Sequence, residues 1–302
     1  MAASDNSIAD DDSRMAVCRL AATTLRNRFD LVWTELQAAC AAENVPEHVH
    51  KLRIATRRAL AAIDAFHDVL PAKRRNWFEK RLIRLRRAAG EARDLDVLTA
   101  RLAQDDMARA RSWLVAMLSR QRIQSRQPIH SQFEKLVEEN WGDRLTRLLE
   151  DLHGRQRKRC FRSFARHRFK PMIMRFFENA DRSLRDTDEL HEVRIKGKKL
   201  RYALEIFAPA FPLVARMRCQ KSLEHFQKAL GECTDHASAA DRFARWARSA
   251  DAGPNRDLLA ALCADENKRA HSARKTFSKW WNPARRRTLR RRFERTLRRH
   301  TA

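Results

Sequence analysis

Two segments of this chain repeat each other residue by residue. The second copy starts at His191, which follows His50 by 141 residues, and the correspondence needs no gap. The identical pairs at this spacing include Arg53 with Arg194, Ile54 with Ile195, Phe66 with Phe207, Pro71 with Pro212, Lys80 with Lys221, Gly90 with Gly231 and Asp94 with Asp235. Self-similarity of this length predicts two copies of one structural unit, related by a pseudo-two-fold axis.

The composition indicates that the repeated unit is helical. Only 6 Gly and 8 Pro occur in 302 residues, which argues against a turn-rich all-β fold and against a Gly-rich nucleotide loop. Because 43% of the residues are hydrophobic, the chain can bury a core and its charge does not indicate disorder. We predict an all-α fold, an internally duplicated helical-bundle domain with pseudo-two-fold symmetry.

The pattern divides the chain into three parts. The acidic residues 1–12 predict a disordered N-terminus, and the Arg-rich residues 283–302 predict a C-terminal helix or tail. The helical domain between them, residues 13–282, is expected to contain one repeat at about 13–152 and another at about 160–282. The polar, basic segment over residues 153–160 is the expected joint between the repeats.

Two local features set expectations within the domain. We expect one helix over residues 73–89, ended by Gly90, and another helical segment over residues 130–152. Gly90 and its counterpart are interpreted as helix-end or packing residues. Asp94 and its counterpart are predicted to cap a helix, and the alternative is that they orient a neighbouring arginine.

The charge balance predicts an anionic partner. The chain has 64 Lys and Arg against 38 Asp and Glu, a formal net charge of +26 at pH 7. Residues 283–302 contribute nine Arg and one Glu, a net of +8, which leaves +18 in the rest of the chain. An excess of this size, spread beyond the tail, is typical of proteins that meet polyanions.

The remaining composition excludes several classes. The six Cys include no Cys-x-x-Cys pair, so we expect reduced thiols and neither a disulfide framework nor a zinc site. The N-terminus does not resemble a signal peptide, and no run of about 18 apolar residues occurs. The expected location is the cytoplasm, without a membrane partner.

Helical geometry places the basic side chains opposite the core. The first basic face comprises His50, Arg53 and Arg57 in the first copy and His191, Arg194, Lys198 and Arg201 in the second. The opposite, core-facing side of the first copy comprises Leu52, Ala59, Ala62, Ile63 and Phe66. The following helix has a further basic face, with Lys80, Arg84 and Arg87 in the first copy and Lys221, His225 and Lys228 in the second. Because like charges at this spacing repel, the recurrence predicts a polyvalent anion that bridges them. For a single helix, solvated surface is the commoner explanation, and either histidine could be an ordinary surface or core residue.

The paired segments HKLRIATRRALAAIDAF and HEVRIKGKKLRYALEIF resemble the CHAD family (conserved histidine α-helical domain). The segments GEARDLDVL and GECTDHASA fit the next motif of that family, and the resemblance covers about residues 14–280. It implies an α-helical duplication that binds inorganic polyphosphate in a basic central cavity, and hence an association with polyphosphate granules. The implied ligands are His50, Arg53, Arg57, Arg58, Lys80, Arg84, Arg87, His191, Arg194, Lys198, Lys199, Arg201, Lys221, His225 and Lys228. The copies differ where Leu60 stands opposite Arg201 and where Thr234 stands opposite Arg93, so they are expected to contribute unequally.

An enzymatic function is the first alternative. Some members of the family are fused to a triphosphate-cleaving domain marked by Glu-x-Glu-x-Lys, and this sequence lacks that motif. It also lacks His-Glu-x-x-His, and on a helix His48 and His50 point about 160° apart, which makes them poor co-ligands. We therefore expect no catalytic residues, no metal and no cofactor.

Nucleic-acid binding through the basic surface and residues 283–302 is the second alternative. Binders of single-stranded nucleic acid combine basic grooves with exposed aromatic rings, whereas Tyr202 is the only aromatic residue within the basic faces. Polyphosphate is therefore the preferred partner, and we expect it to bind without residues 283–302. A structural helical scaffold is the third alternative, and it predicts behaviour that is independent of salt.

Overall fold

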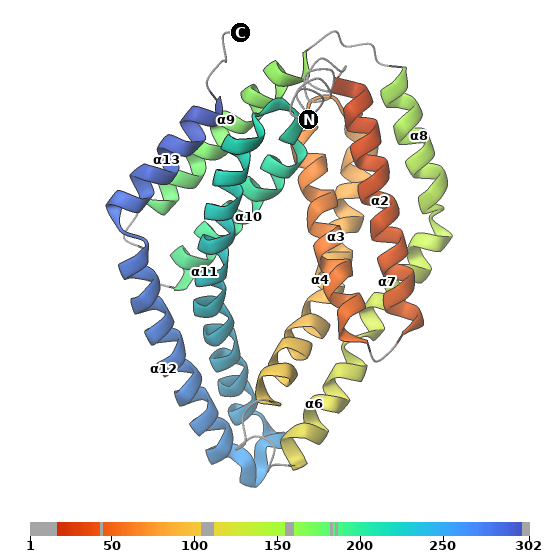
Figure 1. The fold of residues 1–302 in the computed structure, drawn as a ribbon. Helices are drawn as coiled ribbons and strands as arrows, with labels where there is room; N and C mark the ends of the chain where they lie inside the picture. Colours follow the sequence, from red (N-terminus) through yellow and green to blue (C-terminus); the bar gives the residue numbers. More distant parts are fainter. Residues whose placement is uncertain are drawn as a thin grey trace, which may run out of the picture. The chain divides into compact units, whose positions relative to one another are not determined.

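The regular structure of the chain is helical in the computed structural model (Figure 1). The structure describes residues 17–42, 45–103, 112–154, 160–181, 184 and 187–297. No strand occurs among them, which confirms the all-α prediction, and none of their helices is long and apolar enough to cross a membrane. The predicted disorder of residues 1–12, most of the expected joint and the last residues of the tail, 298–302, fall outside the described residues.

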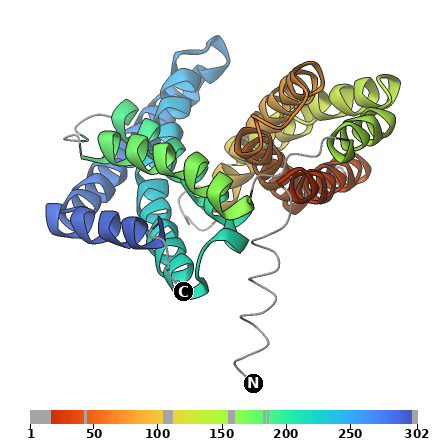
Figure 2. The ribbon, with the colours of Figure 1, turned by 90° about the horizontal axis from the view of Figure 1, so that it is seen from above.

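The chain divides into two compact units, Arg14–Phe161 and Arg162–Ala302, called here the N-terminal and C-terminal units. The helices of the N-terminal unit are α2 (Val17–Ala41), α3 (Pro46–Ala65), α4 (Ala72–Leu102), α6 (Ser112–Gln124), α7 (Gln127–Glu138) and α8 (Trp141–His153). Helix α2 packs on α3, α7 and α8, while α4 packs on α3, α6 and α7 (Figure 2). The rings of Phe29, Phe78 and Trp141, from three of these helices, meet in its core at centroid distances of 4.8 to 5.6 Å.

The core-facing side of α3 is the one that the sequence predicts. Pro46 begins the helix, where its missing N–H leaves no hydrogen bond unmade. Each of the expected core residues is at most 3% exposed, namely Leu52, Ala59, Ala62, Ile63 and Phe66. Burial of one apolar face therefore fixes the rotation of α3 and leaves His50, Arg53 and Arg57 on its half-exposed side.

Two expected helix boundaries are wrong. Helix α4 does not end at Gly90 but continues to Leu102, because the following turns bury their own apolar face, including Ala92 and Leu95. That burial outweighs the cost of about 1 kcal/mol for an interior glycine. The segment 130–152 is broken at Asn140, whose φ of 55° lies in the left-handed region that asparagine tolerates.

The C-terminal unit is organised around one long helix. Its elements are α9 (Phe161–Ala180), α10 (Thr187–Ile206), η1 (Ala208–Ala210), α11 (Leu213–Arg248), η2 (Ala250–Asn255), α12 (Arg256–Trp280) and α13 (Pro283–Leu297). Helix α11 packs on α10, α12 and α13. Phe226 of α11 contacts the rings of Phe176 in α9 and Phe277 in α12, with centroids 5.3 and 5.8 Å apart. The ring of Phe293 joins α13 to the same core.

At one pair of corresponding positions, the two units divide side-chain volume differently between neighbouring helices. At the 141-residue spacing, Thr56 and Leu85 of the N-terminal unit correspond to Gly197 and Phe226 of the C-terminal unit. A Cβ atom on Gly197 would lie 3.0 Å from Cε1 of Phe226, so the glycine makes room for the larger ring. All four positions are buried. The two packing solutions are thus alternatives of similar total volume.

We expect Gly197→Ala to lower the free energy of unfolding by about 1 kcal/mol, although alanine favours a helix. Crowding a buried ring costs about 1–3 kcal/mol, and the gain in helix propensity offsets about 1 kcal/mol of this. Gly142→Ala is the matched control, because nothing lies within 4 Å of the Cβ position there. Urea denaturation of both variants tests this prediction, and stabilisation by Gly197→Ala would contradict it.

Candidate functional site

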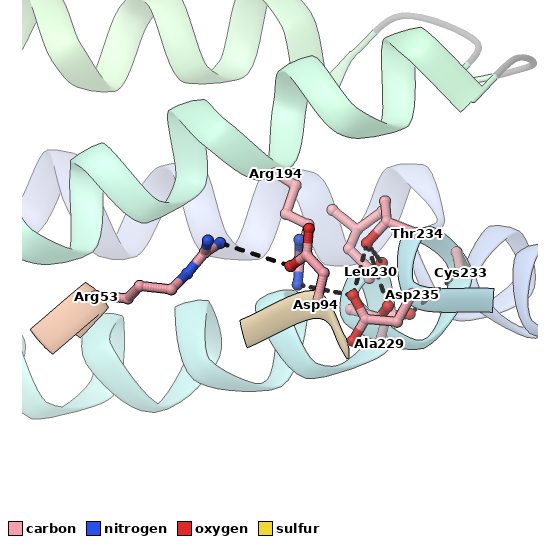
Figure 3. A network of polar contacts seen from close by, with 9 residues as sticks. Arg53, Asp94, Arg194, Ala229, Leu230, Cys233, Thr234 and Asp235 are labelled. Atoms are coloured by element: carbon pink, nitrogen blue, oxygen red, sulfur yellow. Dashed lines mark hydrogen bonds and ion pairs between the residues drawn. The ribbon is translucent and has the colours of Figure 1, made fainter. Parts of the chain in front are cut away.

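An arginine of α3 crosses α4 at its interior glycine. Nη1 of Arg53 donates a hydrogen bond to the carbonyl oxygen of Ala89 at 3.2 Å, and Nη2 lies 3.9 Å from Oδ1 of Asp94 (Figure 3). A Cβ atom on Gly90 would approach Nη1 to 3.2 Å. Glycine at this position therefore lets the guanidinium group lie against the backbone of α4.

The arginine–aspartate pair beside a glycine recurs in the C-terminal unit at the 141-residue spacing. Nη2 of Arg194, on α10, lies 3.4 Å from Oδ1 of Asp235, on α11 (Figure 3). The Cβ position of Gly231 lies 3.5 Å from the same nitrogen. Both aspartates lie in the interior of helices, so the prediction that they cap helices is wrong. They orient arginines, which was the alternative.

Several cations of the N-terminal unit lie close enough to repel one another. Burial, followed by the charge of Arg57, lowers the pKa of Arg53 to about 10, with smaller contributions from Arg93 and Arg86 and an opposing one from Asp94. The pKa of His50 is lowered by burial and by Arg93, Arg57 and Arg53, against the opposing effect of Glu47. Burial and the charges of Arg57 and Arg87 lower the pKa of Arg86. We call this group the α3–α4 cluster and define it as His50, Arg53, Arg57, Arg86 and Arg93.

The α3–α4 cluster includes two arginines, Arg86 and Arg93, that are not among the ligands expected from the sequence. Arg86 and Arg93 lie four residues before and three residues after Gly90, which puts them on the side of α4 that α3 crosses. Lys80 and Arg84 lie further round the helix, about 80° and 120° from Gly90, and both are exposed. The spacing around the glycine is the signal that would have identified the missed arginines. Within the described part of the chain, Arg57, Arg86 and Arg93 have no carboxylate within 4 Å.

The corresponding positions of the C-terminal unit are neutral. Gln227 replaces Arg86, and its Oε1 accepts a hydrogen bond from Nε of Arg201 at 3.1 Å. Thr234 replaces Arg93 and donates a hydrogen bond to the carbonyl oxygen of Leu230 (Figure 3). The cations that remain form what we call the α10–α11 face, comprising Arg194, Lys198, Lys199, Lys221 and Lys228. The two units therefore differ in charge density.

The other predicted ligands differ in their exposure and in their contacts with other side chains. Arg87 of α4 and His191 of α10 are exposed, whereas Arg58 of α3 is half-buried. Nη1 of Arg201 lies 3.1 Å from Oε1 of Glu205, and its guanidinium group lies over the ring of Tyr202. Its charge is therefore balanced locally.

His225 is in contact with an aromatic residue that the sequence analysis did not place near it. Its ring stacks on Trp280 of α12 with centroids 4.4 Å apart, and the guanidinium group of Arg285 lies 4.7 Å from the centroid of the same tryptophan. The expectation that Tyr202 is the only aromatic residue at the basic faces is therefore wrong. Trp280 is half-buried and already packed against protein groups, so it is not a free platform for a base.

A comparison with protein families identifies the family of this chain. The sequence model of the CHAD domain matches residues 23–244, most of the chain. This chain belongs to the CHAD domain family.

Solved structures with the same fold are consistent with this assignment. The crystal structure of the CHAD domain from the plant Ricinus communis matches with a TM-score of 0.69 and 19% identity, covering 93% of this chain and 93% of that chain. PptA from Streptomyces chartreusis matches with a TM-score of 0.61 and 18% identity, covering 88% of this chain and 99% of that chain. At these identities the likeness shows the fold alone. No match was found among curated proteins.

The match places both arginine–aspartate pairs inside the CHAD region. Helices α3, α4 and α10 lie wholly within residues 23–244, and α11 lies within them up to its last turn. Helices α12 and α13 follow the matched residues. Among the described residues of this CHAD domain, no group of three or more His, Cys, Asp and Glu side chains could hold a metal ion.

Proposed function

We propose that this CHAD domain binds inorganic polyphosphate without cleaving it, through the α3–α4 cluster and the α10–α11 face. The observation that carries the proposal is the crossing of Arg53 over α4 at Gly90, which places this guanidinium group near three other arginines, while the adjacent Asp94 pairs with Arg53. Burial and the charges of these arginines lower the pKa of Arg53. Such a cluster destabilises itself by repulsion, and an anion of high charge density would relieve that repulsion. Arginine suits this partner because its planar group can bond two phosphate oxygens at once.

Polyphosphate fits the site better than nucleic acid does. It carries charge on every phosphate but has no bases, so its binder needs cations and no aromatic platforms. The aromatic rings at the basic faces, Tyr202 and Trp280, are packed against Arg201 and His225. A base would have to displace these contacts before it could stack. The family resemblance supports the same partner.

The chemistry of the cluster supports binding without cleavage. Hydrolysis of a phosphoanhydride needs a positioned base or metal ion near the attacked phosphorus. The carboxylate next to the α3–α4 cluster, Asp94, is held by Arg53. Burial, and next the charge of Arg93, lower the pKa of its histidine, His50, so this imidazole is a weak proton acceptor.

The test is a titration of the full-length protein with polyphosphate and with single-stranded DNA at matched phosphate concentration and salt. We expect at least about tenfold tighter binding of polyphosphate, and gel electrophoresis of the recovered ligand should show unchanged chain lengths. Equal affinities would favour a general polyanion or nucleic-acid binder. Shortened chains would show that the protein is a phosphatase.

Binding should also depend on pH through His50. In the free protein, burial and the charges of Arg93, Arg57 and Arg53 lower the pKa of His50, and Glu47 opposes them. A bound polyanion raises this pKa, so binding takes up a proton, and affinity should increase as pH falls from the bound-state pKa to the free-state pKa.

We therefore expect higher affinity at about pH 6 than at about pH 8. His50→Gln should reduce that difference, whereas His191→Gln, at the exposed counterpart, should leave it unchanged. The terminal phosphates of the ligand titrate in all three proteins, so their effect cancels in the comparison. An identical pH dependence in wild type and His50→Gln would contradict the role of this histidine.

A further inference from the structure

A long stretch near the C-terminus has no acidic residue. Between Glu266 and Glu294 the sequence contains eleven Lys and Arg residues and no Asp or Glu. The first part of this stretch is about the last four turns of α12, and the rest is most of α13. Lys268 and Arg269, at its start, lie 3.6 and 3.8 Å from Asp265 and Glu266 in the preceding turn. The cations of α12 that follow have no acidic residue three or four positions away on their own helix.

The α12 part of this stretch lines a hollow. The hollow has a volume of about 400 Å³. Its lining residues are His271, Arg274, Lys275, Ser278 and Lys279. Each of these side chains can donate a hydrogen bond, and none is a carboxylate. A second hollow, of about 320 Å³ on α9, includes the apolar residues Pro171 and Met174, so it is less suited to an anion.

The packing of α12 determines where this hollow lies. Leu259, Glu266 and Phe277 are buried, and α12 makes its main contact with α11. His271 and Lys275 are exposed, while Arg274 is half-buried at the edge of the packed side. The hollow therefore opens away from the α11–α12 contact, and Arg274 lies on its α11 side.

Arg274 connects the hollow to the α10–α11 face. Burial and the charge of Glu232 raise the pKa of the Cys233 thiol in α11 to about 11, and the charges of Arg274 of α12 and Arg194 of α10 oppose this rise. Two arginines from different helices thus come within electrostatic reach of the same sulfur atom. Trp280, which follows Lys279, stacks on His225 of α11, and His225 lies one helical turn from both Lys221 and Lys228 of the α10–α11 face.

We propose that the α12 hollow is an outer phosphate subsite that continues the α10–α11 face and makes this domain favour long polyphosphate chains over short ones. The inference rests on the proposed function. From His271 to Lys279 the hollow extends for about 12 Å along the helix, enough for several phosphates. A short chain is neutralised by the cations of the α10–α11 face alone. A long chain extends beyond this face and gains contacts with the cations of α12.

The test compares long-chain polyphosphate with tripolyphosphate on the double variant Lys275→Gln/Lys279→Gln. We expect its affinity for long chains to fall by about three- to tenfold relative to wild type, and its affinity for tripolyphosphate to stay the same. The matched control is Arg256→Gln/Lys268→Gln, which removes two exposed cations from the same helix outside the hollow. Circular dichroism should show all three proteins equally helical.

The possible outcomes distinguish failure of the subsite from failure of the proposed function. Equal long-chain affinities of the two double variants would overturn the subsite. An equal loss for tripolyphosphate and for long chains would show that the hollow is a primary site, which would overturn the chain-length inference. Failure of the wild-type protein to bind either ligand would instead refute the proposed function itself.

Discussion

Replacing Arg57, Arg86 and Arg93 together by alanine is expected to weaken polyphosphate binding by about two to three orders of magnitude near physiological salt. Each arginine removed takes away a charge-assisted contact and part of the counterion release that drives binding. These three are chosen because none has a carboxylate within 4 Å in the described part of the chain, whereas Arg53 has structural contacts with α4. Isothermal titration calorimetry with polyphosphate measures the effect.

The matched control removes the same charge from another place. Arg287, Arg291 and Arg295 are exposed on one side of α13, so alanine at all three also lowers the net charge by three. We expect this control to change polyphosphate affinity by less than about threefold. The α3–α4 variant should unfold at the same urea concentration as wild type or higher, because it loses a repulsion. Equal affinity losses in the two variants would mean that net charge, and not the cluster, determines binding.

Phe293→Ala is expected to lower the free energy of unfolding of the C-terminal unit by about 3–5 kcal/mol. The ring is fully buried and lies 6.0 and 6.2 Å from the rings of Phe169 and Phe177, measured between centroids. Leu289 and Thr296 are buried beside it, and Oγ1 of Thr296 lies 3.5 Å from Sγ of Cys219. The loss of the ring leaves a cavity in the core that α9 and α13 share. Urea denaturation followed by circular dichroism measures the loss.

The packing of Phe293 affects how the expected binding of polyphosphate without residues 283–302 can be tested. Their described part, up to Leu297, is a packed helix, so deletion removes core side chains together with the arginines. We expect the deletion to destabilise the unit at least as much as Phe293→Ala does. Substitution of Arg287, Arg291 and Arg295 tests the contribution of the tail cleanly, since exposed substitutions cost within about 0.5 kcal/mol each. An unfolding midpoint that is unchanged by the deletion would contradict the packing role of α13.

The fold could be predicted where one helical face is strongly apolar. The rotation of α3 follows from its pattern, and all its expected core residues are buried. Helix boundaries were less predictable, because a glycine usually ends a helix but Gly90 is instead the point where Arg53 crosses α4. That role depends on a contact between helices, and propensity within a single helix cannot reveal it.

The site could be predicted only in part for the same reason. The sequence identified Arg53 and Arg57, which share a face with His50 on one helix. It did not identify Arg86 and Arg93, because the crossing of α3 and α4 at Gly90 determines which face of α4 lies next to Arg53. Trp280 was missed because its contact with His225 joins two helices that are far apart in the sequence. The duplication of the chain and a site shared by the repeats remain predictions.

The salt dependence of polyphosphate affinity tests the central claim most directly. For wild type, the logarithm of the affinity should fall steeply and linearly with the logarithm of the salt concentration. For the variant without Arg57, Arg86 and Arg93, the slope should be smaller by about 2, since each lost phosphate contact reduces it by about 0.7. Equal slopes for the two proteins would show that polyphosphate does not contact the α3–α4 cluster, and would contradict the proposed function.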